Sequence, residues 1–373
     1  MKKILLSATA IVVAGAFALT GCSSSARGGD SGAGGSSTAK GFAADAKIGV
    51  ALPDKTSENW VLAGKLFTDG LTKAGFKPDV QYAPASNTVA EQQNQISAMV
   101  TGGAKVIIIG AKDGKQLSTQ VKAAHDAGAT VIAYDRLIEN TDAVGYYVAF
   151  DNFKVGQLQG QALLDGLAKR AGHAAPYNIE LFSGSADDAN SAVFFKGAMD
   201  VLQSKIKDGT LKVVSGQTEI TQTATDGWKA ENAQRRMDAI LTANYSSANL
   251  DGVLSPNDTL ARAIITSAQQ AGKKVPVVTG QDSEVESVKS IMEGVQYSTI
   301  NKDTTLLVAQ AIKMAQELQK GSTVDVNDTK SYNNGVKVVP SYLLAPVIVT
   351  KDNAADAYAN VPNLLDIVKS YSK

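Results

Sequence analysis

Short apolar runs alternate with amphipathic segments along most of the chain. The apolar runs are rich in Val and Ile, which is typical of β-strands, and the segments between them repeat apolar residues every three or four positions, as helices do. The predicted strands are 48–52, 80–82, 106–109, 130–134, 146–150, 179–182, 213–215, 252–254, 275–279 and 297–300. Because strands alternate with helices, and runs such as 106–109 are apolar throughout, we expect parallel sheets covered by helices on both faces.

These strands are too many for one sheet of ordinary size, and 373 residues suffice for two domains. The sequence therefore predicts an α/β protein of two lobes, each built on a doubly wound parallel sheet. Hydrophobic residues make up 44% of the chain, which allows a large core, and 36 basic residues balance 36 acidic ones. This balance gives no indication of nucleic acid or an anionic membrane surface as a partner, and it favours a neutral ligand.

The N-terminus has the pattern of an export signal. Lys2 and Lys3 precede an apolar run over 4–19, and Leu-Thr-Gly-Cys follows, ending at the chain's one cysteine, Cys22. This context resembles a bacterial lipobox, which implies that 1–21 is a signal peptide and that Cys22 carries the lipid that anchors the protein outside the cytoplasm. The alternative is an unmodified thiol in a discarded peptide. Residues 22–45 are rich in Ser, Gly and Ala and predict a flexible tether spanning roughly 25 Å.

Polar residues follow many of the predicted strands directly. Open α/β sheets bind ligands beyond the carboxyl ends of their strands, so these positions are candidates for a site. They are Asp135–Arg136, Asp151–Asn152, 187–190, Asn257–Asp258, Asp282 and Lys302. One such residue alone is better explained as a helix cap or a turn. Six groups in succession indicate a polar cleft, and their mixture of donors and acceptors suits the hydroxyl groups of a sugar.

Two tryptophans and two histidines complete the candidate chemistry. Trp60 and Trp228 occupy loop-to-helix positions, where they are either core residues or aromatic walls against the C–H face of a pyranose. His125 and His173 lie in polar contexts and are expected at the surface, so the sequence predicts no His-based triad, no His/Cys metal cluster and no cofactor. Residues 110–115 lack the spacing of a phosphate-binding loop.

Several segments together resemble a known family. They are KIGVALPDK at 47–55, NW at 59–60, VIAYDRLI at 131–138, FDN at 150–152, SPND at 255–258, GQD at 280–282 and NK at 301–302. From about residue 47 onward the chain resembles the sugar-binding proteins of ABC importers, and among them the xylose and multiple-monosaccharide binders. The resemblance implies a type I periplasmic binding protein, with two Rossmann-like lobes that three crossovers join and a hinge closes on one sugar. The expected lobes are 46–150 plus 301–339, and 151–300 plus 340–373.

The resemblance also implies roles for individual residues. Those expected to hydrogen-bond the sugar are Arg136, Asp188, Asn190, Asn257, Asp282 and Lys302. Trp60 and Trp228 resemble the aromatic walls. Lys55 and Asp135 are expected beside these residues, where they either contact the ligand or orient Arg136. Asn59 stands where these relatives commonly have arginine, so the resemblance does not specify which sugar fits. The implied partners are a monosaccharide of the xylose, glucose, galactose or arabinose type and the membrane subunits of an importer, with a membrane sensor also compatible. A monomer without catalytic activity is expected.

Three other functions are weighed against this one. A binding protein for a nucleoside or an autoinducer has the same fold, and fold alone does not decide the ligand. An enzyme acting on saccharides needs two carboxylates at a fixed separation, for which the sequence has no local signature. A ligand-binding gene regulator is disfavoured because the export signal removes the chain from the cytoplasm and no DNA-binding module precedes residue 47.

Overall fold

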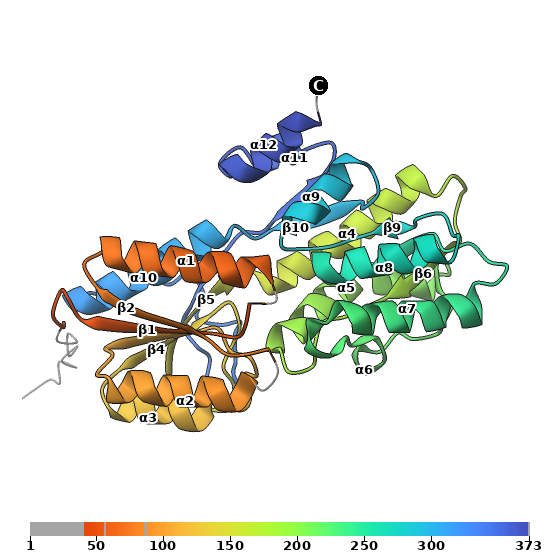
Figure 1. Ribbon diagram of the computed structural model, residues 1–373. Coiled ribbons are helices and arrows are strands. Elements are labelled where there is room, and N and C mark those ends of the chain that lie inside the picture. Colours follow the sequence, from red (N-terminus) through yellow and green to blue (C-terminus); the bar gives the residue numbers. More distant parts are fainter. Residues whose placement is uncertain (1–40, 56, 86–87, 372–373) are drawn as a thin grey trace, which may run out of the picture. The chain divides into compact units, whose positions relative to one another are not determined.

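Two groups of strands organise the protein (Figure 1). The structure is a computed structural model that describes residues 41–55, 57–85 and 88–371. The expected signal peptide, Cys22 and most of the expected tether lie outside the described residues. Within the described ranges, no helix combines the length and apolar character needed to cross a membrane.

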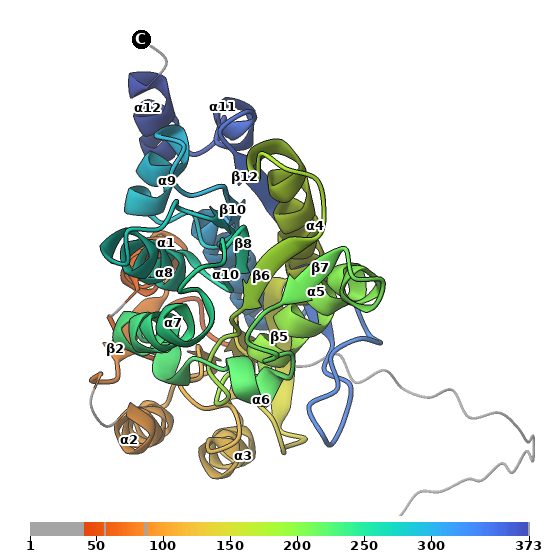
Figure 2. The same ribbon diagram turned by 90° about the vertical axis from the view of Figure 1, so that its right-hand side faces the viewer.

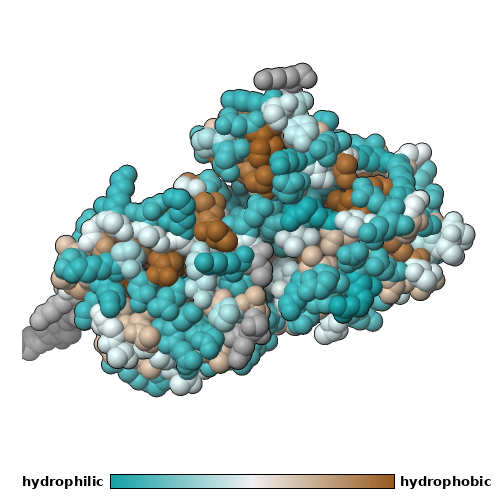
Figure 3. Space-filling model, viewed as in Figure 1, coloured by the Kyte–Doolittle hydropathy of each residue, from teal (hydrophilic) through white to brown (hydrophobic). Residues whose placement is uncertain are grey.

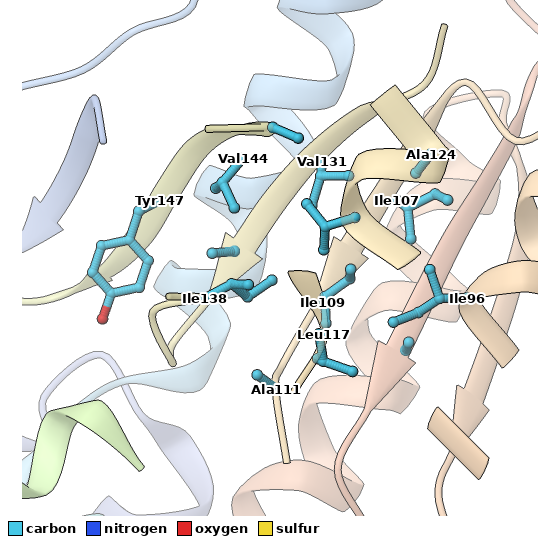
Figure 4. Packing of buried hydrophobic residues seen from close by; sticks show 14 of the residues in the cluster. Ile96, Ile107, Ile109, Ala111, Leu117, Ala124, Val131, Ile138, Val144 and Tyr147 are labelled. Carbon is cyan, nitrogen blue, oxygen red and sulfur yellow. The ribbon is translucent and has the colours of Figure 1, made fainter. Parts of the chain in front are cut away.

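The first lobe contains a parallel sheet of six strands in the order β11-β5-β4-β3-β1-β2. Its elements are β1 (Lys47–Leu52), α1 (Glu58–Lys73), β2 (Lys77–Tyr82), α2 (Thr88–Thr101), β3 (Val106–Ile109), α3 (Ser118–Asp126), β4 (Thr130–Tyr134), β5 (Val144–Phe150), α10 (Thr304–Lys320) and β11 (Ser341–Leu344). Alternate residues of β3 serve opposite faces, because side chains alternate along a strand. Ile107 and Ile109 pack toward α2 and α3 (Figure 4), whereas Val106 and Ile108 pack toward α1 and α10.

The second lobe combines a parallel sheet, in the order β7-β6-β8-β9, with an antiparallel pair, β10-β12. Its elements are α4 (Asn152–Arg170), β6 (Tyr177–Leu181), α5 (Ala189–Lys207), β7 (Leu211–Val213), α6 (Ile220–Thr223), η1 (Asp226–Trp228), α7 (Ala230–Asn244), β8 (Gly252–Leu254), α8 (Asp258–Gln270), β9 (Val277–Val278), α9 (Val285–Met292), β10 (Ser298–Asn301), β12 (Val347–Thr350), α11 (Ala354–Ala357) and α12 (Pro362–Ser370). Helices α4 and α5 lie on one side of β6 and β8, and α7 and α8 lie on the other (Figure 2). The predicted two-lobe α/β fold is confirmed, and the antiparallel pair is an addition that the sequence did not predict.

Glycines bring α4 and α5 into backbone contact. A Cβ added at Gly156 would lie 2.0 Å from the carbonyl oxygen of Phe194, and one added at Gly197 would lie 2.2 Å from that of Phe153. No side chain fits at either position, which is why glycine, with no Cβ, is required for this close approach. The contact fixes α5, whose N-cap and first turn carry two residues of the candidate site, Asp188 and Asn190.

Three crossovers connect the lobes. The chain leaves the first lobe after β5, returns after β10 and leaves again at Ala345–Pro346, between β11 and β12. The expected boundary between 339 and 340 is therefore wrong, because β11 pairs with β5 in the first sheet (Ser341 opposite Tyr147). The first lobe extends through Leu344.

The last residues of the expected tether are folded. Phe42 packs against Phe76, with ring centroids 6.5 Å apart, and its N–H donates to the carbonyl of Gln319 at 3.0 Å. Asp45 pairs with Lys77 at 2.6 Å. The prediction of a flexible segment up to residue 45 is therefore wrong for its end, since Phe42 has an apolar surface to cover.

Candidate ligand-binding cleft

A cleft of about 540 Å³ lies at the carboxyl ends of the strands of both lobes. This volume is in the range of small-molecule sites in proteins. Residues from the loops after β1, β3, β4, β6, β8, β9 and β10 line it. Of the residues that the sequence predicted, the lining contains Asn59, Trp60, Asp135, Arg136, Asp188, Asn190, Trp228, Asn257, Asp282 and Lys302. Lys55 is not among them: it is exposed, and its Nζ lies 4.8 Å from the centre of the Tyr82 ring.

Arg136 and Asp188 form an ion pair across the cleft. Arg136 Nε lies 3.0 Å from Asp188 Oδ2, and the two side chains are 12% and 4% exposed. The guanidinium also donates from Nη1 to the Ala111 carbonyl at 3.2 Å and lies 5.5 Å from the centre of the Trp60 ring. Burial alone would lower the pKa of Arg136, but Asp188 and Asp135 outweigh it and raise that pKa. The cation is therefore permanent.

Asp188 has a second role at the start of α5. Its Oδ1 accepts the N–H of Asn190 at 3.0 Å, so the same carboxylate caps the helix and pairs with Arg136. Capping orients the side chain because it fixes one of the two oxygens. The alternatives of helix cap and site residue, which the sequence left open, are thus combined here.

Lys302 and Asp282 form a second pair where the chain crosses back to the first lobe. Lys302 Nζ lies 2.9 Å from Asp282 Oδ1, and the side chains are 11% and 15% exposed. Burial alone would lower the pKa of Lys302, but Asp282 and Asp135 raise it, so the ammonium group stays charged. Burial raises the pKa of Asp135, and Lys302 opposes that shift only in part.

Three asparagines of the lining differ in what they can offer a ligand. Asn257 caps α8 through Oδ1, which accepts the Leu260 N–H at 3.0 Å, and its NH₂ group is therefore the end that can donate to a ligand. Asn190 donates to the Asp135 carbonyl at 2.7 Å, and Asn59 donates to the Asp282 carbonyl at 3.3 Å. These two amides bind backbone of the other lobe, a use that the sequence did not predict.

Two aromatic side chains enclose the cleft. Trp60 meets Tyr134 edge to face, with ring centroids 6.1 Å apart. Trp228 follows Gly227 and has a φ of 56°, a left-handed conformation that costs a large side chain of order 1–3 kcal/mol. It is accommodated because Gly184 has no side chain: a Cβ there would lie 2.1 Å from the Trp228 ring.

A donor and an acceptor in the lining are buried without a partner. Trp228 Nε1 and Gln281 Oε1 have no hydrogen-bond partner among the described residues. Buried polar groups in native proteins are nearly always hydrogen-bonded, and each exception requires an explanation. A ligand with hydroxyl groups can accept from the first and donate to the second.

Sequence reasoning missed a third ion pair. Lys112 Nζ lies 2.9 Å from Asp54 Oδ2, the side chains are 17% and 5% exposed, and both residues line the cleft. Asp54 comes soon after β1, so the rule applied to the other loops would have found it. Lys112 lies in the segment 110–115, which lacks the spacing of a phosphate-binding loop but places one cation shortly after the end of β3.

The two histidines lie away from the cleft lining. His125 is 66% exposed, and His173 is 42% exposed and pairs with Asp251 at 3.0 Å. Within the described ranges, no group of three or more His, Cys, Asp or Glu residues is placed to hold a metal ion.

Comparisons with known proteins identify the family. The model of the periplasmic binding protein domain matches residues 48–323. The chain is 48% identical over 318 residues to the multiple sugar-binding periplasmic receptor ChvE of Rhizobium radiobacter, covering 84% of this chain and 89% of that protein. It is 37% identical over 316 residues to the D-xylose-binding periplasmic protein of Escherichia coli, covering 84% and 89%. An ABC transporter solute-binding protein of Clostridium phytofermentans, solved with bound β-D-glucose, superposes with a TM-score of 0.81 at 39% identity, over 86% of this chain and 99% of that one. The chain belongs to the periplasmic binding protein family.

Proposed function

We propose that the protein captures a monosaccharide outside the cytoplasm and delivers it to an ABC importer. The observation that carries the proposal is the unpartnered pair in the cleft, Trp228 Nε1 and Gln281 Oε1, beside two aromatic side chains. A sugar supplies hydroxyl groups to the polar atoms and C–H faces to the rings. The similarity to a multiple sugar-binding receptor, and to a structure with bound glucose, supports the same class of ligand.

The charges of the lining favour a neutral sugar over a sugar phosphate or a sugar acid. The lining contains five carboxylates and four cations, which are Asp54, Asp135, Asp188, Glu231 and Asp282 with Lys112, Arg136, Lys229 and Lys302. Three of the cations already pair with carboxylates at 2.9 or 3.0 Å. An added anion would compete for these cations and would meet an excess of negative charge, which is unfavourable in a desolvated cleft.

Closure of the lobes traps the ligand in this proposal. Contacts that join the lobes directly include the Arg136–Asp188 ion pair and a hydrogen bond from the Val285 N–H to Glu58 Oε2 at 3.2 Å. Each of these contacts forms only when the two lobes meet, so together they stabilise a closed state around a sugar. Three crossovers can act as the hinge, because few residues need to change their backbone angles.

The N-terminal sequence is the basis for the proposed location outside the cytoplasm. Cys22 is the proposed site of lipid attachment, and the tether that follows would hold the binding domain at the outer face of a membrane, as a monomer, near the importer. Incorporation of radiolabelled palmitate in a bacterial host tests this. Label in the wild type and none in Cys22→Ser supports the anchor, and equal label in both contradicts it.

The sugar is identified by a thermal-shift screen of the chain that begins at Ala39, which keeps Phe42 in place. The panel contains pentoses, hexoses, sugar acids, nucleosides and amino acids. A ligand present at 100 times its Kd stabilises the folded state by about 2.7 kcal/mol, which is easily seen as a rise in Tm. A rise with one or a few neutral monosaccharides supports the proposal. A response to nucleosides alone, or the appearance of product from a glycoside, would replace it with a non-sugar binding protein or an enzyme.

A further inference from the structure

Asp258 follows the cleft residue Asn257 but does not line the cleft itself. It is fully buried, and its carboxylate accepts hydrogen bonds from three residues. Oδ1 accepts from Gln296 Nε2 at 2.9 Å. Oδ2 accepts from Thr299 Oγ1 at 2.9 Å and from the N–H of Glu284 at 3.0 Å. The N–H of Asp258 itself donates to the Gln281 carbonyl at 3.0 Å. One side chain thus connects the start of α8, the loop after β9 and strand β10.

The loop after β9 has a strained backbone. Asp282 has a φ of 97° and Ser283 a φ of 54°, and residues other than glycine keep such angles only where their surroundings hold them. The next N–H, of Glu284, donates to Asp258. The N–H of Ser283 donates to Thr299 Oγ1 at 3.2 Å, and that hydroxyl donates to Asp258. The N–H of the strained Ser283 and that of Glu284, which follows it, therefore both depend on Asp258, the first through Thr299 and the second directly.

Each segment that Asp258 holds carries a polar residue of the cleft. Asn257 precedes Asp258 in the chain, Asp282 begins the strained run, and Lys302 follows the end of β10. Space around the carboxylate is tight: a Cβ added at Gly280 would lie 2.1 Å from Asp258 Oδ1. The carboxylate therefore has little freedom to move.

We infer that Asp258 is a positioning residue for sugar binding, which holds Asn257, Asp282 and Lys302 in register without contacting the sugar. The inference rests on the proposed function. A positioning role differs from a purely structural role because it predicts a loss of affinity for the sugar in protein that is still folded. Groups that bind a ligand must be held within about 0.5 Å of their productive positions, so a displacement of about 1 Å is expected to weaken sugar binding.

Glu180 provides a matched control. It is also fully buried in the second lobe, and its carboxylate likewise accepts three hydrogen bonds, from the N–H and the hydroxyl of Ser215 at 3.0 and 2.5 Å and from the Tyr245 hydroxyl at 2.8 Å. Neither Glu180 nor these partners line the cleft. Glu180→Ala therefore removes a comparable buried network that holds no residue of the site.

The experiment compares Asp258→Ala and Thr299→Val with Glu180→Ala, in the protein and with the sugar found by the screen. Calorimetry measures Kd at a temperature well below the Tm of each variant. A thermal melt gives that Tm. Asp258→Ala is expected to raise Kd on the order of 10- to 100-fold, and Thr299→Val about 3- to 10-fold, because it removes one link and keeps the carboxylate. Glu180→Ala is expected to lower Tm and to leave Kd within about twofold of the wild type.

A double-mutant cycle with Asp282→Ala separates positioning from general destabilisation. If Asp258 acts through Asp282, Asp258→Ala or Thr299→Val will add much less to Kd in the Asp282→Ala background than in the wild type. Should Asp258→Ala fail to fold, Thr299→Val decides alone. Unchanged Kd in the Asp258 and Thr299 variants, or fully additive effects with Asp282→Ala, overturns the inference. Absence of sugar binding by the wild type overturns the proposed function instead.

Discussion

Replacing Arg136 with alanine is expected to weaken sugar binding strongly. The substitution leaves Asp188, whose side chain is 4% exposed, without the guanidinium that lies 3.0 Å away across the closed cleft. Truncating one partner of a buried charge pair costs about 2–5 kcal/mol, and every 1.4 kcal/mol is tenfold in affinity. Kd should therefore rise from about 30-fold to several thousand-fold.

The same substitution should affect the free energy of unfolding much less. The ion pair joins the two lobes, so Asp188 can reach water when they separate, and the sugar-free protein avoids most of the cost of an unpaired charge. Exposed pairs contribute about 0–1 kcal/mol, which is the loss expected in the absence of sugar. Calorimetry of the sugar and urea unfolding without it give the two numbers separately.

Arg236→Ala is the control for removing a partly buried arginine. Arg236 donates to the Leu181 carbonyl at 2.9 Å and to Gln217 Oε1 at 2.7 Å, and all three residues belong to the second lobe. This variant should lose stability and retain its Kd. If Arg136→Ala binds sugar within threefold of the wild type, or loses as much unfolding free energy as binding free energy, the reasoning about the closed cleft is refuted.

Three further substitutions test separate features. Trp228→Gly should weaken sugar binding about tenfold through loss of the aromatic wall, while Tm falls little because glycine adopts the φ of 56° without strain; a large fall in Tm measured by thermal shift would contradict this. Glu58→Ala removes the acceptor of the Val285 N–H at the start of α9, which is worth about 0.3–1 kcal/mol. Kd should rise by the same factor, about 2- to 5-fold, for every sugar tested, and a change in the ratio between two sugars would count against a role in closure alone. For His173, a hydrogen bond to Asp251 raises the pKa, so the pair stabilises the folded state below the ordinary histidine pKa of about 6.5 and the effect is lost as pH rises through the raised value. His173→Gln should therefore lower Tm more at about pH 5.5 than at about pH 8.5, and equal shifts at both would refute the assignment.

The central strands could be predicted from the sequence because both faces are buried. Strand β3 is found at the predicted residues, Val106–Ile109, and all four are fully buried. Strand β2 begins at Lys77, three residues before the expected 80. The sequence did not predict these residues because the strand lies at the edge of the sheet and contains Pro78 and polar residues, which weaken the apolar signal. Strand β11, another edge strand, was not among the predicted strands, and the expected boundary placed it in the second lobe. Burial on both faces creates the apolar signal, and edge strands lack it.

Residues of the candidate site could be predicted where a residue lies at the end of the loop that follows a strand and also caps the next helix. Asp188 and Asn257 cap helices at the carboxyl edges of the sheets and line the cleft, so local sequence carries the signal. The contacts of Asn59 could not be predicted, because its amide reaches the Asp282 carbonyl 223 positions away. Such a contact depends on how the lobes meet, which no local pattern describes.

The order of strands along the chain has a consequence for how the protein is made. Strand β11 covers the edge of β5, and β12 pairs with β10, yet both arrive after nearly all the rest of the chain. Until residues 341–344 pair with it, β5 presents unpaired backbone groups along one edge, and such an edge can pair with another chain. Residues 341–350 therefore add the last strand to the sheets of both lobes. A nascent chain interrupted before Ser341 would retain most of its core but would be prone to self-association.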